Sequence, residues 1–151
     1  MELFDEFFRI VQEFQNRKIS YAVVGGIAMA FHDRPRFTKD IDILIHPKDS
    51  EKVRTILEGL GYFASAEPWT FKKAKLTLHR FMKIEREDHL VVDVLLGRDD
   101  RHKEIIKNAL LEKSSGGIVR IASREDIVWM KQCRDSDQDR VDIRKLQNEQ
   151  D

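Results

Sequence analysis

The segment spanning residues 40–45 begins by alternating aspartate with isoleucine, which places two carboxylates two residues apart. Because successive side chains of a strand point to opposite faces, Asp40 and Asp42 share one face. Neighbouring carboxylates repel each other unless a cation lies between them. Carboxylate oxygens suit Mg²⁺ or Mn²⁺ and would not select zinc. Asp40 and Asp42 are therefore predicted to bind a divalent metal ion.

A third carboxylate, Asp93, lies in the middle of the apolar segment 90–96. A charge in such a strand is costly unless it has a partner in the folded protein. One partner is an arginine, in a buried salt bridge. The other is a metal ion shared with Asp40 and Asp42, and the presence of all three carboxylates favours this second interpretation.

A glycine pair, Gly25-Gly26, joins an apolar strand to a short apolar helix. The simplest interpretation is a tight turn that needs unusual backbone angles. The functional alternative is that the missing side chains allow phosphate oxygens to approach backbone N–H groups at the start of the helix. The order along the chain is informative, because the glycine pair precedes the Asp-x-Asp strand and the lone aspartate follows it.

Several other polar and aromatic residues are weaker candidates for binding. Arg36 and Lys39 lie in the loop before the acidic strand, where they could neutralise a triphosphate or simply face solvent. Thr38 could order the same loop. Lys131 could reach a nucleotide from a C-terminal helix, although a surface lysine is the simpler interpretation. Trp69 is a loop aromatic that could stack on a base.

Composition indicates a globular protein of 151 residues, with 41% hydrophobic and 36% charged residues. A formal net charge of zero argues against the strongly basic surface of a general nucleic-acid binder. No apolar run approaches the roughly 20 residues of a membrane-spanning helix, and the first residues lack a basic leader segment. Cys133 is the only cysteine, so no internal disulfide can form. A cytoplasmic location without membrane contact is expected.

Hydrophobic periodicity and turn residues predict an α+β fold, a small mixed β-sheet with helices packed against it. We expect a single domain over 1–151, with C-terminal helices at about 123–147 packed on the sheet. The pattern predicts helices over 2–17, 27–31, 47–60, 100–111, from 123 onward and 137–147. It predicts strands over 20–24, 40–45, 76–85, 89–96 and 117–121.

With these motifs in order, the sequence resembles the DNA polymerase beta-type nucleotidyltransferase superfamily. The matching residues are Gly25-Gly26, Asp40-Ile41-Asp42 and Asp93, although many members have Ser at position 26. Within the superfamily, the run Arg36-Phe37-Thr38-Lys39-Asp40-Ile41-Asp42 resembles the AbiEii-like branch, which includes abortive-infection and toxin–antitoxin components. Segments 123–131 and 139–143 resemble the C-terminal pattern of that branch.

The resemblance implies a nucleotidyltransferase fold and the transfer of a nucleoside monophosphate from a nucleoside triphosphate to a hydroxyl acceptor. It implies Mg²⁺ or Mn²⁺, held by Asp40, Asp42 and Asp93, with Asp93 serving the acceptor hydroxyl and the glycine pair placing the phosphates. The acceptor stays open between RNA, a protein and a small molecule. An alternative is a nucleotide-binding module without turnover, such as a partner of a cognate toxin or antitoxin protein. A third possibility is a fold member without nucleotide chemistry.

Overall fold

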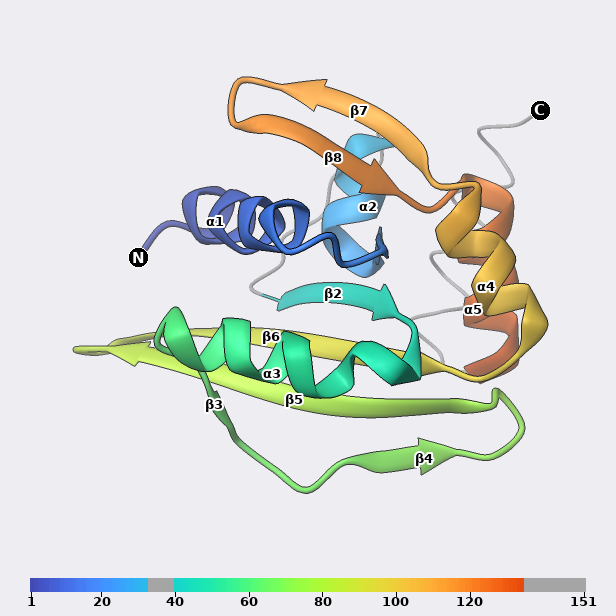
Figure 1. Ribbon diagram of the computed structural model, residues 1–151, viewed down its shortest axis with the longest axis horizontal. Helices are drawn as coiled ribbons and strands as arrows, with labels where there is room; N and C mark the ends of the chain where they lie inside the picture. The colour runs from blue at the N-terminus through green and yellow to red at the C-terminus, as the bar shows by residue number, and fades with distance from the viewer. Residues whose placement is uncertain (33–39, 135–151) are drawn as a thin grey trace.

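The computed structural model describes residues 1–32 and 40–134 and has an eight-stranded sheet. The strand order is β3-β5-β6-β2-β1-β8-β7, with β4 pairing to β5 outside this path (Figure 1). Two strand pairs, β1–β8 and β2–β6, are parallel, and the other pairs are antiparallel. The predicted α+β class with a mixed sheet is confirmed.

The described residues form helices and strands with the following bounds. The helices are α1 (Leu3–Asn16), α2 (Gly25–Phe31), α3 (Ser50–Gly59), α4 (Asp100–Lys107) and α5 (Arg124–Arg134), with a 3₁₀ turn at Pro47–Asp49. The strands are β1 (Tyr21–Val24), β2 (Asp40–Ile45), β3 (Phe63–Ala64), β4 (Trp69–Phe71), β5 (Leu76–Glu85), β6 (Asp88–Gly97), β7 (Leu110–Ser114) and β8 (Gly117–Ile121).

Most predicted elements are present, and one was placed wrongly. The helix predicted over 100–111 ends at Lys107, because Leu110 and Leu111 pair with β8 as the start of β7. Their apolar side chains fit a helical period as well as a strand, so periodicity alone did not separate the two. The short strands β3 and β4 were not predicted. The helix predicted over 137–147 lies outside the described residues.

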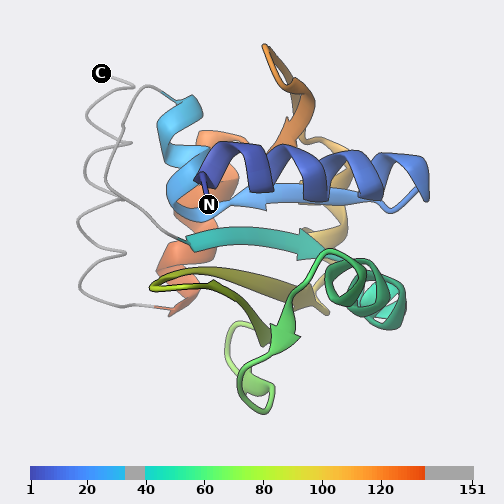
Figure 2. The same ribbon diagram turned by 90° about the vertical axis from the view of Figure 1, so that its left-hand side faces the viewer.

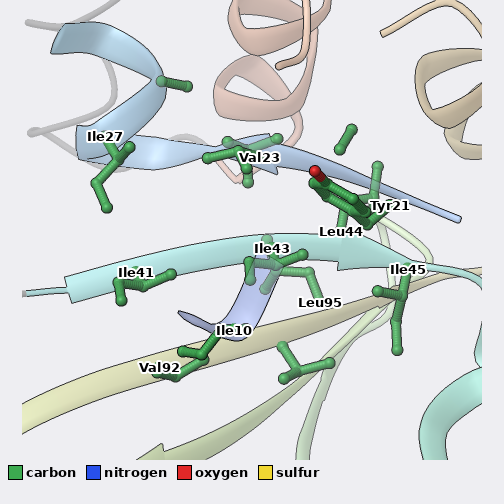
Figure 3. Close-up of a cluster of buried hydrophobic side chains, with 14 of the residues drawn as sticks. Ile10, Tyr21, Val23, Ile27, Ile41, Ile43, Leu44, Ile45, Val92 and Leu95 are labelled. Atoms are coloured by element: carbon green, nitrogen blue, oxygen red, sulfur yellow. The ribbon is translucent and has the colours of Figure 1, made fainter. Parts of the chain in front are cut away.

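The hydrophobic core lies between the sheet and the helices packed on it, and it includes buried side chains from all five helices. Ile43 and Val92 are fully buried in β2 and β6, and Ile10 of α1 lies against them (Figure 3). Burying each such side chain contributes about 1.5–3 kcal/mol. Glu2 caps α1 by accepting hydrogen bonds from the backbone N–H groups of Phe4 and Asp5. Helices α1 and α3 occupy one side of the sheet, and α5 lies on the other side (Figure 2).

Within residues 1–32 and 40–134, no helix is both long enough and apolar enough to cross a bilayer.

Candidate active site

A row of charged side chains crosses three neighbouring strands on one face of the sheet. In the parallel pairing of β2 with β6, Asp42 lies directly opposite Asp93. In the antiparallel pairing of β6 with β5, Asp93 lies directly opposite Arg80. Asp40 shares the face of Asp42 at the start of β2. The fold thus brings the three predicted carboxylates to one region and adds an arginine. We call Asp40, Asp42, Asp93 and Arg80 the acidic row.

The charge of Asp93 is paired with Arg80. Asp93 is 4% exposed, and its two oxygens accept hydrogen bonds from Arg80 Nε at 2.8 Å and from a second guanidinium nitrogen at 2.9 Å. Such bidentate, charge-assisted pairs are among the stronger hydrogen bonds of proteins. The hydrogen bond to Asp93 raises the pKa of Arg80, and the charges of Asp93, Asp40 and Asp42 act in the same direction. The salt-bridge alternative for Asp93 is therefore present in the structure.

Arg80 was not among the residues predicted from the sequence, because the strands expected over 76–85 and 89–96 do not place it opposite Asp93. A three-residue turn over 86–88 was expected, but Asp88 already pairs with Glu85, so the turn has two residues. A shift of one residue moves a side chain to the other face of the sheet. Counting back from the Arg86-Glu87 turn would have placed Arg80 opposite Asp93.

The turn at Gly25 positions the carboxylate of Asp42. Val24 pairs with Asp42, so the chain turns into α2 directly beside that side chain. Gly25 has a φ of +73°, which side chains rarely adopt, and a Cβ atom there would overlap the Asp42 carboxylate. Gly25 is thus required both for the turn and for the close approach. Gly26 follows it as a buried residue of α2.

Helix α5 is fixed at its start by the residues that directly precede it. Ser123 accepts a hydrogen bond from the backbone N–H of Asp126 at 3.2 Å. The His32 ring and the Ala122 carbonyl are 2.9 Å apart, which ties the end of α2 to the segment between β8 and α5. Lys131, further along α5, is only 4% exposed. The expectation of a surface lysine at this position was wrong.

The remaining predicted binding residues are three loop residues and one aromatic residue. Arg36, Thr38 and Lys39 lie outside the described residues, so their roles stay predictions. Trp69 is 37% exposed on β4, and the guanidinium carbon of Arg80 lies 5.5 Å from its ring centroid. The aromatic side chain considered for stacking therefore borders the acidic row.

The acidic row offers oxygen ligands of the kind that Mg²⁺ and Mn²⁺ prefer. Asp40 is exposed and Asp42 is half-buried, whereas both oxygens of Asp93 are engaged by Arg80. Among residues 1–32 and 40–134, no group of three or more His, Cys, Asp or Glu side chains is arranged to hold a metal ion. The carboxylate oxygens of Asp40, Asp42 and Asp93 are therefore of a kind that suits such a cation, and those of Asp93 also accept hydrogen bonds from Arg80.

Solved structures of similar proteins identify the fold. A protein of Thermotoga maritima assigned as a nucleotidyltransferase is 18% identical, with a TM-score of 0.63, and the match covers 95% of this chain and 91% of that one. The lincosamide antibiotic adenylyltransferase LnuA, bound to lincomycin, is 17% identical with a TM-score of 0.60, covering 95% of both chains. The fold is that of the nucleotidyltransferases.

A further neighbour is the antibiotic-resistance factor ANT(2″)-Ia, which is 19% identical with a TM-score of 0.61. The match covers 97% of this chain and 83% of that factor. A search of curated proteins gave no match. A family model described as "Uncharacterised nucleotidyltransferase" matches residues 1–138. The chain belongs to this nucleotidyltransferase family.

Proposed function

We propose that the protein transfers a nucleoside monophosphate from a nucleoside triphosphate to a hydroxyl acceptor, with Mg²⁺ or Mn²⁺ held by Asp40 and Asp42. The observation that carries this proposal is the acidic row itself. In a chain of this family, Asp42 lies beside the Gly25 turn and opposite Asp93. Charges so close together on one sheet face are unfavourable for stability alone and are typical of sites that bind cations and phosphates.

In the proposed reaction, an acceptor oxygen forms a bond to the α-phosphorus of the triphosphate. The bond from that phosphorus to the oxygen bridging to the β-phosphate breaks, pyrophosphate leaves, and the acceptor proton passes to a carboxylate or to solvent. When bound, the divalent cation would neutralise phosphate charge and stabilise the oxygens that gain charge. Gly25 and Gly26 would leave room for the phosphates, and Arg36, Thr38, Lys39 and Lys131 are the further residues proposed to contact the nucleotide.

Three classes of molecule carry a hydroxyl group that could serve as acceptor. RNA, a protein hydroxyl and a small molecule all remain candidates from the sequence. LnuA acts on lincosamide antibiotics by its name, and one structure of ANT(2″)-Ia is a complex with adenylyl-2″-tobramycin. Hydroxylated small molecules are therefore the first class that we would test.

A second candidate function is nucleotide binding without turnover, as part of a toxin–antitoxin pair of the AbiEii-like branch. The observation in its favour is that Arg80 engages both oxygens of Asp93. Turnover that requires Asp42 would support the enzyme. Stoichiometric nucleotide binding without turnover, together with a tightly bound partner protein, would support the module.

The test is incubation of the purified protein with each α-phosphate-labelled nucleoside triphosphate and Mg²⁺ or Mn²⁺ in cell lysate. We expect label in one class of acceptor, lost in Asp42→Asn. Asp100→Asn is the matched control, because Asp100 is an exposed carboxylate of α4 whose only ion pair among residues 1–32 and 40–134 is with Lys103. Labelling that is equal in wild type and Asp42→Asn would overturn the proposal.

A further inference from the structure

We infer that a cavity at the end of the sheet remote from the acidic row is a second binding site, which takes the phosphate groups of a nucleotide-sized ligand. The cavity has a volume of about 670 Å³. Every ionisable side chain of residues 1–32 and 40–134 that lines it is basic, and these side chains are Lys18, His46, Lys103, Lys107 and Arg120. We call it the basic cavity. None of its residues is proposed to act in nucleotidyl transfer, so the inference goes beyond the proposed function.

The basic cavity and the acidic row lie at opposite ends of β1 and β2. In the antiparallel pairing of these strands, Val24 lies opposite Asp42, whereas Tyr21 lies opposite Ile45. At about 3.3 Å per residue, these two positions are roughly 10 Å apart along the strands. His46, which follows Ile45, lines the cavity. Helix α4 lies at the end to which β2 points and contributes two lysines (Figure 1). The two sites therefore share no lining residue.

Most of the positive charge in the basic cavity is not balanced by carboxylates. Lys18, Lys107 and Arg120 form no ion pair among residues 1–32 and 40–134. Lys103 pairs with Asp100 at 3.7 Å, but both side chains are exposed, and such surface pairs contribute little. The partial negative charge at the end of α4 accounts for Lys107 but not for Arg120, which lies on β8. Lys and Arg equal Asp and Glu in number, at 27 each, so the excess of positive charge is local.

The fold fixes the backbone that carries these cations. The chain leaves α1 through two backbone hydrogen bonds, from Lys18 to Gln15 at 3.2 Å and from Ile19 to Phe14 at 2.8 Å. They hold Lys18 at a φ of 57°, in the left-handed conformation that usually follows a helix end as glycine. Arg120 is half-buried on β8, which pairs with β1. A backbone that is fixed before the ligand binds reduces the entropy lost on binding.

The size and charge of the basic cavity favour a polyphosphate. Its volume is that of a small-molecule site, for which roughly 300–1,000 Å³ is usual. Lysine and arginine are the side chains that bind phosphate, and several of them together suit a group with several negative charges. Ile19 and Ile106 add an apolar surface that a nucleoside could cover. A nucleic-acid backbone fits less well, because it needs an extended basic surface.

The test is isothermal titration calorimetry of the full-length protein in metal-free buffer at physiological ionic strength. The probes are inorganic triphosphate, ATP, adenosine and a single-stranded RNA oligonucleotide. We expect inorganic triphosphate to bind one to one and adenosine not to bind. Lys107→Gln and Arg120→Gln should each raise the Kd of triphosphate about tenfold, since each removes a hydrogen bond to a charged group. Lys52→Gln is the matched control, because Lys52 is an exposed lysine of α3 outside the cavity, and it should leave the Kd unchanged.

The ratio of the two phosphate ligands identifies the source of the phosphate. Tighter binding of ATP than of triphosphate, lost in the same variants, would indicate a nucleoside polyphosphate, and equal binding would indicate a free polyphosphate. No triphosphate binding by wild type, an unchanged Kd in folded Lys107→Gln, or binding of the RNA alone would overturn the inference. Lys107 is exposed, so this variant decides even if Arg120→Gln does not fold. The proposed transfer needs Mg²⁺ or Mn²⁺, so a negative result in metal-free buffer would leave it intact.

Discussion

Strand β5 carries two ion pairs of the same kind, one on each of its faces. On one face, Lys83 lies 2.6 Å from Glu6 of α1 and 5.6 Å from the Tyr62 ring centroid. On the other, Arg80 pairs with Asp93 and lies 5.5 Å from the Trp69 ring centroid. Each is a buried carboxylate with a cation held over an aromatic ring.

The two pairs differ in what surrounds them. The Lys83 side chain is 12% exposed and bridges α1 to the sheet, so the pair is enclosed. The Arg80 side chain is 38% exposed and also interacts with the charges of Asp40 and Asp42. An enclosed pair contributes to the fold, whereas an open pair beside two further carboxylates is suited to binding cations and phosphates. Mutations in the two pairs should therefore affect different properties.

The largest expected effect is on turnover at the open site. Asp42→Asn should lower the nucleotidyl-transfer rate by on the order of 100-fold or more, because a ligand of the proposed cation is lost. The fold should be retained, since removing one of several neighbouring carboxylates relieves repulsion. Initial rates with labelled triphosphate measure the first effect and urea unfolding the second. A rate within a factor of two of wild type would contradict the assignment.

The enclosed pair should show the opposite behaviour. Glu6→Gln removes the carboxylate 2.6 Å from the largely buried Lys83 and leaves it only Glu85, at 3.9 Å. The free energy of unfolding should fall by about 3 kcal/mol. Glu13→Gln on the same helix is the control, because Arg17 is exposed and Glu13 partly exposed, and such a surface pair contributes about 0–1 kcal/mol. Turnover of the folded fraction should be unchanged in both variants. A stability loss equal to that of Glu13→Gln would show that the enclosed pair is not structural.

A substitution at Gly25 should disturb the open site through the backbone. Gly25→Ala requires a side chain at a φ of +73° and displaces the Asp42 carboxylate. We expect a loss of roughly 1–3 kcal/mol in unfolding free energy, together with weaker triphosphate binding. Gly59→Ala is the matched control, because a Cβ there meets nothing within 4 Å, and alanine is favoured over glycine in a helix. If folded Gly25→Ala binds the triphosphate as tightly as wild type, the Gly25 turn plays no part in triphosphate binding.

Breaking the open pair itself should lower stability less than breaking the enclosed pair. Asp93→Asn should lower the free energy of unfolding by about 1–2 kcal/mol, less than for an enclosed pair. Arg80 is 38% exposed, so it retains solvent and the neighbouring carboxylates as partners. Urea unfolding of Asp93→Asn and Glu6→Gln, measured in parallel, gives the ratio of the two losses in unfolding free energy. Equal losses in the two variants would remove the distinction between open and enclosed pairs.

The strands of the site could be predicted because their side chains alternate with period two. The bounds of β2 and β5 and the shared face of Asp40 and Asp42 follow from that alternation alone. The partner of Asp93 did not follow, because it depends on whether Asp88 belongs to a turn or to a strand. Local residue preferences do not decide whether the turn has two or three residues. The backbone hydrogen bonds along the whole hairpin fix this length.

Other features depend on contacts between segments distant in sequence. Strand β7 begins at Leu110 because β8 is available to pair with it, and the two leucines alone fit a helix equally well. The burial of Lys131 results from the packing of α5 against the rest of the protein, which the residues around Lys131 in the sequence do not predict. The close approach of Gly25 to Asp42 needs the pairing of β1 with β2.

The central claim is that Asp40 and Asp42 hold a divalent cation together with a nucleoside triphosphate. It is tested most directly by melting temperature with Mn²⁺, with a non-hydrolysable triphosphate, and with both. A ligand that binds only the native state stabilises it by about 2.7 kcal/mol at 100 times its Kd. Wild type should melt higher with both ligands than with either alone, and folded Asp42→Asn should not respond to the combination. An equal rise in Asp42→Asn would contradict the claim.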